Sequence, residues 1–274
     1  MSLPEAHPAA NSPVIRCAVI GQPIQHSKSP PIHLAFASQF GLLLQYDRID
    51  ASPAAFADTV RAFFAGGGLG LSVTLPHKTA ALALADDIGE RARRAGAANT
   101  LGRDASGRIW ADNTDGIGLV NDLQRLALPI HGRRVLLLGA GGAAAGVIPA
   151  LLDAKPALLA LRNRTPVNAV ALLDRHADPR LRLARDDDAP YELVISTVSE
   201  GAAALLTDMP LAASASGYDL NYGERAAATL CAMREHGLNP VHDGRGMLIE
   251  QAAAAFARWH NCQPDTAPLH RNGF

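Results

Sequence analysis

The sequence predicts an α/β protein with two domains, and three observations support this prediction. The chain has 274 residues, more than the roughly 100–200 residues of a typical single domain. Short apolar runs alternate with segments of helical spacing, which is typical of strands and helices that build a mostly parallel sheet. A glycine-rich turn at residues 139–142 stands between an apolar run and an Ala-rich segment, and we expect a second α/β domain to begin there.

The first third of the chain carries this alternation from its start. Short apolar runs predict strands, and apolar residues at helical spacing predict helices. Three glycines at positions 66–68 mark a break before the last strand of this part. The strands are expected at residues 15–20, 45–50 and 69–75, and the helices at residues 33–40 and 54–64.

The second half repeats the alternation around the glycine-rich turn. We expect a helix after residue 113 that runs to residue 128, a strand at 134–138 and a helix after the turn. The charge-rich run 180–188 is interpreted as a solvated loop or a helix end. Residues 247–259 are predicted to form a long amphipathic helix and residues 264–274 a polar tail. Later strands are expected at residues 158–162, 193–197, 216–220 and 240–241.

Charge and composition favour a small-molecule partner. Lys and Arg number 25 and Asp and Glu 26, so we expect neither a nucleic acid nor an anionic membrane as the partner. The apolar runs are far shorter than the ~20 residues of a membrane-spanning helix. Residues 1–13 form a polar lead-in without the features of a signal peptide. Cys17, Cys231 and Cys262 are widely spaced and odd in number, which suits a reducing, cytoplasmic location.

The glycine-rich turn is the first candidate site. Gly139, Gly141, Gly142 and Ala143 belong to a G-x-G-x-x-G/A pattern between a strand and a helix. Such a turn brings backbone N–H groups and a helix N-terminus to the pyrophosphate of a dinucleotide. The alternative is a tight strand-to-helix turn with a purely structural role.

The end of the following strand predicts which dinucleotide binds. Asn163, Arg164 and Thr165 stand about 20 positions after the turn, where an NAD-specific site places an acid for the ribose 2′-hydroxyl. This chain has no acid there, and Arg164 with its two neighbours offers donors for a 2′-phosphate. NADP is therefore preferred over NAD, the alternative being that Arg164 is only a solvated residue at a strand end.

Four short motifs outside this turn carry candidate substrate-binding and catalytic groups. Ser27 and Ser29 stand in a proline-rich loop where hydroxyls can hold a carboxylate, although Ser-Pro segments also form plain turns and helix caps. Lys78 can exchange a proton with a reacting hydroxyl, or it can be a surface lysine. Asn99 supplies an amide that both donates and accepts. Asp115 opens a predicted helix and, taken alone, is also explained as its N-cap.

Together with the glycine-rich turn, these motifs resemble the shikimate dehydrogenase family in order and spacing. The similarity extends from Gly21 to about Pro264, over nearly the whole chain. The conjunction is far more specific than any single motif. The segments that carry it are residues 21–30, 72–78, 97–100, 112–116, 139–144, 218–222 and 243–252.

The resemblance implies an NADP-dependent interconversion of shikimate and 3-dehydroshikimate, a step of aromatic amino acid and chorismate biosynthesis, without a metal. Lys78 and Asp115 would handle the proton of the reacting ring hydroxyl while a hydride passes to the nicotinamide, and either of the two can take the proton. Ser27 and Ser29 would hold the substrate carboxylate. By the same resemblance, Thr74, Asn99, Tyr222 and Gln251 would contact hydroxyls or line the pocket, and Gly244 and Met247 would lie near the nicotinamide.

The resemblance also implies a domain organisation. Residues 1–114 and 244–274 would form an N-terminal, discontinuous substrate-binding domain, and residues 115–243 a Rossmann-type NADP-binding domain. The active site would lie in the cleft between them. The partner would be a shikimate-like ring acid, and the protein would act as a monomer or a homodimer.

Several positions depart from the usual family pattern and leave the exact substrate open. Ser72 stands where Asn is common, and Asn168 stands near the expected 2′-phosphate, where a second basic residue is frequent. Ser-Thr-Val-Ser at 196–199 replaces Asn-Ala-Thr-Ser. Glu224 and Ala227 stand where the family often has a Pro or a Thr after the segment of Tyr222.

Two other interpretations remain. The chain can be a quinate/shikimate dehydrogenase or a paralogue that acts on a shikimate analogue, although Arg164 stands where members that use NAD tend to have an acid. It can also be a non-catalytic ligand-sensing domain of the same fold. The presence of both Lys78 and Asp115 argues against a sensor, since a sensor need only bind.

Overall fold

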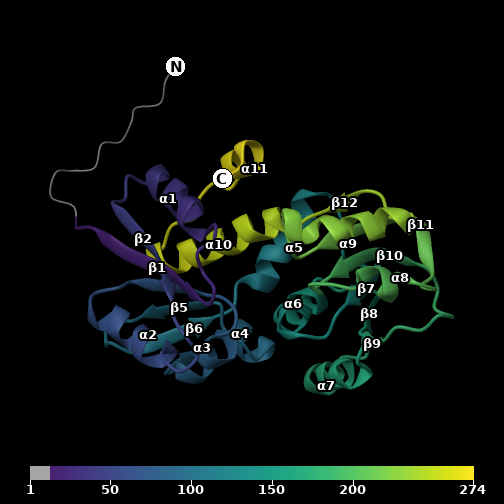
Figure 1. Cartoon of the computed structure of the whole chain (residues 1–274), viewed down its shortest axis with the longest axis horizontal. Coiled ribbons are helices and arrows are strands. Elements are labelled where there is room, and N and C mark those ends of the chain that lie inside the picture. Colours follow the sequence, from purple (N-terminus) through teal and green to yellow (C-terminus); the bar gives the residue numbers. More distant parts are fainter. Residues whose placement is uncertain (1–12) are drawn as a thin grey trace. The chain divides into compact units, whose positions relative to one another are not determined.

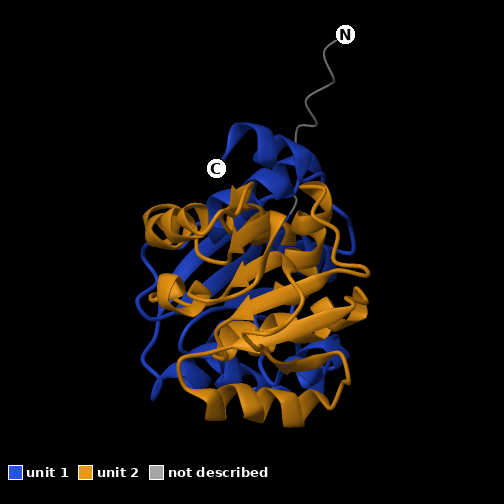
Figure 2. Cartoon of the chain, turned by 90° about the vertical axis from the view of Figure 1, so that its right-hand side faces the viewer, with its two compact units in different colours: residues 1–114, 251–274 blue, residues 115–250 orange. Residues whose placement is uncertain are grey.

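The computed structural model describes residues 13–274. The polar lead-in of the sequence analysis therefore lies, up to residue 12, outside the described residues. The chain divides into two compact units (Figure 2): unit 1 holds the described residues up to Thr114 and Gln251–Phe274, and unit 2 holds Asp115–Glu250. Residues 244–250, which the predicted division places in the substrate-binding part, thus belong to unit 2. Among the described helices, none has the length and apolar character needed to cross a membrane.

Unit 1 is built on a six-stranded sheet of mixed direction with the order β2-β1-β3-β5-β6-β4 (Figure 1). The β1–β2, β1–β3 and β4–β6 pairs are parallel, whereas β3–β5 and β5–β6 are antiparallel, so the expectation of a mostly parallel sheet is wrong only around β5. For β5 and β6 the reason is the short connection 104–108, because a few residues suffice to join antiparallel strands whereas a parallel crossover needs a dozen or more. The strands are β1 (Ile15–Gly21), β2 (Leu44–Asp50), β3 (Gly70–Val73), β4 (Asp87–Ile88), β5 (Thr100–Arg103) and β6 (Ile109–Asp112).

Helices cover both faces of this sheet. In β1, Ala18 and Ile20 point into one apolar core, and Cys17 and Val19 point into another on the opposite face. Trp259 closes the second core and donates from its indole nitrogen to the Leu101 carbonyl at 3.0 Å. The helices of unit 1 are α1 (Ser29–Gln39), α2 (Phe56–Ala65), α3 (Lys78–Leu84), α4 (Glu90–Ala95), the later turns of α10 (Arg245–His260) and α11 (Ala267–Asn272).

Two predictions for unit 1 need correction. Helix α1 begins at Ser29, not at residue 33, because proline is accepted in the first turn of a helix, where its missing N–H is not needed. Residues 264–274, predicted as a polar tail, contain α11, and its Leu269 is buried. The segment is tied to α1 by Gln39, whose side-chain oxygen accepts from the Asp265 N–H at 2.8 Å.

Unit 2 is built on an entirely parallel sheet with the order β12-β11-β10-β7-β8-β9. The run 180–188 was predicted as a solvated loop or a helix end, and this is wrong for its first part, which is the edge strand β9 with a buried Leu181. Its charges are largely paired, since Arg182 binds Asp188. The strands are β7 (Arg134–Leu138), β8 (Leu158–Arg162), β9 (Leu181–Leu183), β10 (Tyr191–Ser196), β11 (Leu211–Asp219) and β12 (Val241–His242).

Helices lie on both faces of the second sheet as well, as in a doubly wound fold (Figure 1). Val135 and Leu137 of β7 point into one core, and Leu136 and Leu138 point into the other. The predicted fold class, with two α/β units, is thereby confirmed. The helices of unit 2 are α5 (Asp115–Arg125), α6 (Gly142–Asp153), α7 (Pro166–His176), α8 (Ala202–Leu206), α9 (Glu224–Glu235) and the first turns of α10.

Candidate functional site

The glycine-rich turn joins β7 to α6 at the carboxyl edge of the parallel sheet. Gly139 has φ +104, and a Cβ there would overlap the Thr197 hydroxyl, so only glycine fits. Its N–H donates to the Arg162 carbonyl at 2.8 Å. A Cβ added at Gly141 or Gly142 would meet no atom within 4 Å, so the backbone at the start of α6 faces open space.

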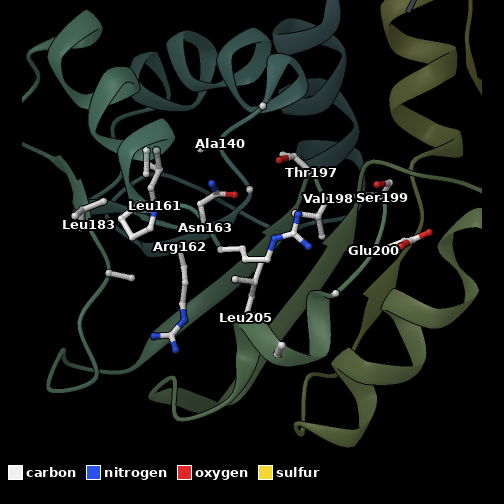
Figure 3. A pocket seen from close by; sticks show the side chains of 18 residues that line it. Ala140, Leu161, Arg162, Asn163, Leu183, Thr197, Val198, Ser199, Glu200 and Leu205 are labelled. Carbon is white, nitrogen blue, oxygen red and sulfur yellow. The ribbon is translucent and has the colours of Figure 1, made fainter.

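A pocket of about 820 Å³ opens beside this turn, entirely within unit 2. Figure 3 shows Ala140 and Asn163 on one side of it, and Thr197, Val198 and Ser199 on the loop after β10. The pocket lies where the strand ends of β7, β8 and β10 meet, which is where open parallel sheets bind their ligands. Its lining also includes Gly139, Gly141, Arg162, Arg164, Leu183, Ala184 and Glu200.

Cationic groups at the end of β8 give this pocket its charge. The exposed guanidinium of Arg164 forms no hydrogen bond or ion pair with another described residue, whereas Arg162 is held by Asp186 at 2.9 Å. Asn163 donates to the Thr165 carbonyl at 2.8 Å and so shapes the turn after β8. Exposed helix N–H groups, an uncommitted arginine and the absence of an acid at the end of β8 fit a dinucleotide with an extra phosphate.

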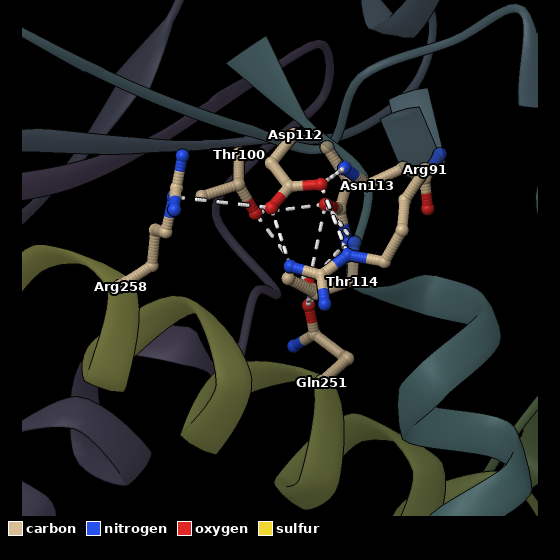
Figure 4. Close-up of polar contacts among 8 residues, drawn as sticks. Arg91, Thr100, Asp112, Asn113, Thr114, Gln251 and Arg258 are labelled. Atoms are coloured by element: carbon tan, nitrogen blue, oxygen red, sulfur yellow. Dashed lines mark hydrogen bonds and ion pairs between the residues drawn. The ribbon is translucent and has the colours of Figure 1, made fainter. Parts of the chain in front are cut away.

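A second group of polar residues lies in unit 1 (Figure 4). Asn99 donates from Nδ2 to Thr114 Oγ1 at 2.9 Å and to Gln251 Oε1 at 3.3 Å, while its Oδ1 accepts the Thr114 N–H at 2.8 Å. Thr114 also donates to the Gln251 oxygen at 3.4 Å. The three side chains come from β5, β6 and α10 or their ends, so the fold brings together residues 152 positions apart. We call Asn99, Thr114 and Gln251 the amide cluster.

Asp112 anchors the edge of the sheet next to this cluster. Its carboxylate is buried and accepts from Arg91, and Arg258 of α10 lies 4.0 Å away. One carboxylate oxygen also accepts the Asn113 N–H at 2.7 Å, while the Asn113 amide donates to the Ala97 carbonyl at 2.9 Å. These bonds hold the strand ends that present the amide cluster.

The predicted catalytic residues begin two different helices. Lys78 is the first residue of α3 in unit 1, and its carbonyl accepts the N–H of Ala98, the neighbour of Asn99, at 2.9 Å. Asp115 is the first residue of α5 in unit 2 and follows Thr114 of the amide cluster directly in the chain. Lys78 is therefore bound through its backbone to a neighbour of the cluster, and Asp115 is the next residue in the chain after a member of it.

The serine loop and Thr74 also lie in unit 1. Ser27 Oγ and Ser29 Oγ are 3.3 Å apart, and Arg48 fixes the loop by donating to the Ser27 carbonyl at 2.7 Å. The Thr74 N–H donates to the Ile20 carbonyl at 3.0 Å. Ser72, one of the departures from the family pattern, is buried and shares a hydrogen bond of 2.7 Å with the Tyr46 hydroxyl. The serine at this position therefore provides the hydrogen-bond partner of a buried tyrosine.

Tyr222 and Gly244 lie in two loops of unit 2 that are hydrogen-bonded to each other, and Met247 follows Gly244 in the first turn of α10. The Gly244 N–H donates to the Asn221 carbonyl at 2.8 Å, and a Cβ at Gly244 would overlap the Leu220 carbonyl. The carboxylate of Asp243 accepts the N–H of Gly223, which follows Tyr222, at 3.3 Å. Half-buried Tyr222 and buried Met247 are therefore held on segments with defined mutual positions.

A buried carboxylate, that of Asp219, is hydrogen-bonded to the first of these loops. Asp219 is fully buried and accepts from the Asn221 backbone and side chain, and Asn221 in turn donates to the Val198 carbonyl at 2.8 Å. Burial raises the pKa of Asp219 from 3.8 to about 6, against the lowering effect of the Asn221 hydrogen bonds. Asp219 Oδ2 and Ser196 Oγ have no hydrogen-bond partner among the described residues, and Ser196 stands where the family commonly has Asn.

Some residues of both regions are not among the predicted site residues. Thr114, which bridges Asn99 and Gln251, appears in the sequence analysis only within the motif 112–116. Its position directly before Asp115, a predicted catalytic residue, was a signal that could have identified it. Val198 and Glu200 line the pocket from the loop after β10. That loop was predictable, because parallel strands next to the glycine-rich turn end at the same edge.

The parallel sheet, the glycine-rich turn and the arginine beside it define the class: an α/β protein with a Rossmann-type dinucleotide site. Two family models match the chain. One is described as the shikimate dehydrogenase substrate binding domain and matches residues 19–101, and the other as the shikimate 5'-dehydrogenase C-terminal domain and matches residues 244–271.

Individual relatives are similar in sequence to this protein over nearly the full chain. A shikimate dehydrogenase (NADP(+)) of Xanthomonas oryzae pv. oryzae is 46% identical over 269 residues, covering 94% of this chain and 95% of that protein. One of Halorhodospira halophila is 46% identical over 259 residues, with coverages of 92% and 95%. The chain belongs to the shikimate dehydrogenase family.

Solved structures show the same fold. Shikimate 5-dehydrogenase of Thermus thermophilus, in complex with NADP(H) and shikimate, superposes with a TM-score of 0.81 at 31% identity, covering 94% of this chain and 97% of that one. Shikimate dehydrogenase of Aquifex aeolicus gives a TM-score of 0.81 at 27% identity, with coverages of 96% and 98%.

Proposed function

We propose that this chain is an NADP-dependent shikimate dehydrogenase, which interconverts shikimate and 3-dehydroshikimate. The observation that carries the proposal is the pocket beside the glycine-rich turn, where Arg164 stands uncommitted at the end of β8. Membership of the family and the Thermus relative, whose structure holds both NADP(H) and shikimate, support the same cofactor and ring acid. Shikimate and NADP⁺ would give 3-dehydroshikimate, NADPH and a proton.

The residues of unit 2 would hold the cofactor. Gly141, Gly142 and Ala143 would present backbone N–H groups to the pyrophosphate, and Gly139, whose N–H is bound to the Arg162 carbonyl, would shape the turn. Arg164 with Asn163 and Thr165 would bind the 2′-phosphate. When bound, NADP supplies the nicotinamide that accepts or returns the hydride. Gly244 and Met247 would lie along the nicotinamide.

Polar residues would bind the ring acid and handle its proton. Lys78 and Asp115 would handle the proton of the reacting hydroxyl, and either of the two side chains can take it. Ser27 and Ser29 would hold the carboxylate. Thr74, Asn99, Tyr222 and Gln251 would contact the remaining hydroxyls, for which the amide cluster offers donors and acceptors.

We also propose a division of labour: unit 1 would bind mainly the substrate, and unit 2, to which residues 244–250 with Gly244 and Met247 belong, would bind NADP. The protein would work in the cytoplasm as a monomer or a homodimer, and its three free cysteines suit a reducing compartment. Light scattering of the purified chain and fractionation of its source cells would test these two statements.

Steady-state assays with shikimate and quinate, each with NADP⁺ and NAD⁺, would test the activity. We expect the highest kcat/KM for shikimate with NADP⁺. Quinate with NAD⁺ outperforming that pair would replace the proposal by a quinate dehydrogenase. Binding of ring acid without any turnover would instead indicate a sensor of the same fold.

A further inference from the structure

We propose that Tyr218 and Asp122 are positioning residues that hold the first turn of α10, and with it Met247, relative to the helix that carries Asp115. All of these residues lie in unit 2. The inference rests on the proposed function, because it assigns a role in hydride transfer to a network of residues that touch neither substrate nor cofactor.

The network centres on a buried carboxylate of α5. Asp122 is 1% exposed and accepts from Arg125 at 2.8 Å and from the Tyr218 hydroxyl at 2.7 Å. Burial, and then the charge of Asp122, raise the pKa of Tyr218 well above its ordinary value. The phenol therefore stays protonated and donates to the carboxylate, which is the stronger, charge-assisted kind of hydrogen bond.

Tyr218 and Asp122 also contact the start of α10. The Met247 N–H donates to the Tyr218 hydroxyl at 3.2 Å, so one of the first-turn N–H groups that no helical carbonyl can reach finds its acceptor there. A Cβ at Gly246 would overlap the carboxylate of Asp122, so the helix backbone rests directly on that side chain. The first turn of α10 is thus fixed by one hydrogen bond and one close approach.

This arrangement couples two helices that the proposed reaction needs. Asp122 lies seven residues, about two helical turns, after Asp115 and so on the same face of α5. Leu119 of that helix shares a buried core with Tyr218 and Met247. A shift of the Asp122–Tyr218 contact would therefore displace Met247 relative to α5. Met247 lies beside the proposed nicotinamide site, and α5 carries Asp115, one of the two residues proposed to handle the proton.

The expected consequence is a loss of rate at nearly unchanged binding. Tyr218→Phe keeps the ring in the core but leaves Asp122 with one donor fewer and the Met247 N–H without its acceptor. Misplacement by about 1 Å can cost on the order of 100-fold in rate, and a partial shift should lower kcat about tenfold. The pocket beside the glycine-rich turn does not include these residues, so KM for NADP⁺ should stay within about threefold.

The chain offers a matched control. Tyr191 is as buried as Tyr218, lies in the same sheet and donates its hydroxyl to another carboxylate, that of Asp188. Tyr191→Phe therefore removes a comparable bond without touching α10. Both variants should lower the free energy of unfolding to a similar degree, because each removes a hydrogen bond to a carboxylate.

The test compares kcat, both KM values and the primary isotope effect with shikimate deuterated at the reacting carbon. A lower kcat and a larger isotope effect in Tyr218→Phe alone support the proposal. Equal kcat in the two variants, or a fall caused only by KM, overturns it. If Tyr218→Phe does not fold, Asp122→Asn, which keeps an acceptor for the tyrosine, takes its place under the same criteria. A wild-type chain that turns over no ring acid would overturn the proposed function itself.

Discussion

The candidate sites of the two units are formed by different groups, backbone at the glycine-rich turn of unit 2 and side chains in unit 1. In unit 2 the part of the pocket beside the glycine-rich turn is shaped by backbone: a glycine with positive φ, a helix start that faces open space and strand ends of a parallel sheet. In unit 1 the candidate site is made by side chains, with Asn99, Thr114 and Gln251 hydrogen-bonded to one another. A backbone site depends on a contiguous motif, whereas a side-chain site depends on strands and helices brought together by the fold.

This difference predicts where each unit is sensitive to substitution. Loss of a single hydroxyl or amide should disturb the unit 1 site, because each group there has partners that are left unsatisfied. The unit 2 site should respond mainly to loss of its charge.

Lys78→Ala should have the largest effect. We expect kcat with shikimate and NADP⁺ to fall about 10²–10⁴-fold, the usual size of a proton-transfer contribution, with a modest change in ring-acid binding. Steady-state kinetics and a direct binding measurement would separate the two. Lys155→Ala, an exposed lysine of unit 2, is the control. An unchanged kcat would refute the catalytic assignment.

Arg164→Ala should remove the charge on which NADP selection depends. A hydrogen bond to a charged group contributes about 1.5–3 kcal/mol, so KM for NADP⁺ should rise roughly 10–100-fold while KM for NAD⁺ hardly changes. The measurement is the ratio of kcat/KM for the two cofactors, with Arg175→Ala on α7 as a control. Equal losses for both cofactors would count against a 2′-phosphate role.

Thr114→Val tests the amide cluster with almost no change in volume. It removes the hydroxyl that accepts from Asn99 at 2.9 Å and donates to Gln251. A lost buried partner costs about 1–2 kcal/mol, so KM for shikimate should rise roughly 5–30-fold and KM for NADP⁺ should not. Thr197→Val is the counterpart in unit 2, where we expect less than about threefold in either KM. Equal changes of KM in the two variants would contradict the proposed difference between the units.

Asp219→Asn should leave kinetic constants nearly unchanged and alter stability. The folded pKa of Asp219 is about 6 against 3.8 ordinarily, so the folded chain binds this proton more tightly than the unfolded chain. The free energy of unfolding should therefore fall as pH rises from about 4 to about 6, by roughly 3 kcal/mol for this group. Denaturant unfolding at pH 4.5 and 7 should show this slope in the wild type and lack most of it in the variant. A variant that retains the slope would assign it to other groups.

The comparison also explains which parts of the fold were predictable. Unit 2 was predicted closely because buried parallel strands are continuous apolar runs: β8 matches residues 158–162. In unit 1 the short strands β4, β5 and β6 were not predicted, since two to four residues such as Asp87–Ile88 carry no periodicity. The helix α11 was missed because it depends on burial of Leu269 and on bonds to Gln39, which are distant in sequence.

The sequence by itself determined the class of the fold, the glycine-rich turn and the arginine that follows it, because these depend on backbone conformation and on local order in the chain. The motifs around Lys78, Asn99 and Asp115 were equally visible as residues. Only the tertiary structure decided that Asn99, Thr114 and Gln251 form one cluster, that Leu181 begins an edge strand, and that Gly246 rests on Asp122. The physical reason is that hydrogen bonds and packing act over a few ångströms in space, which the separation of residues along the chain does not reveal.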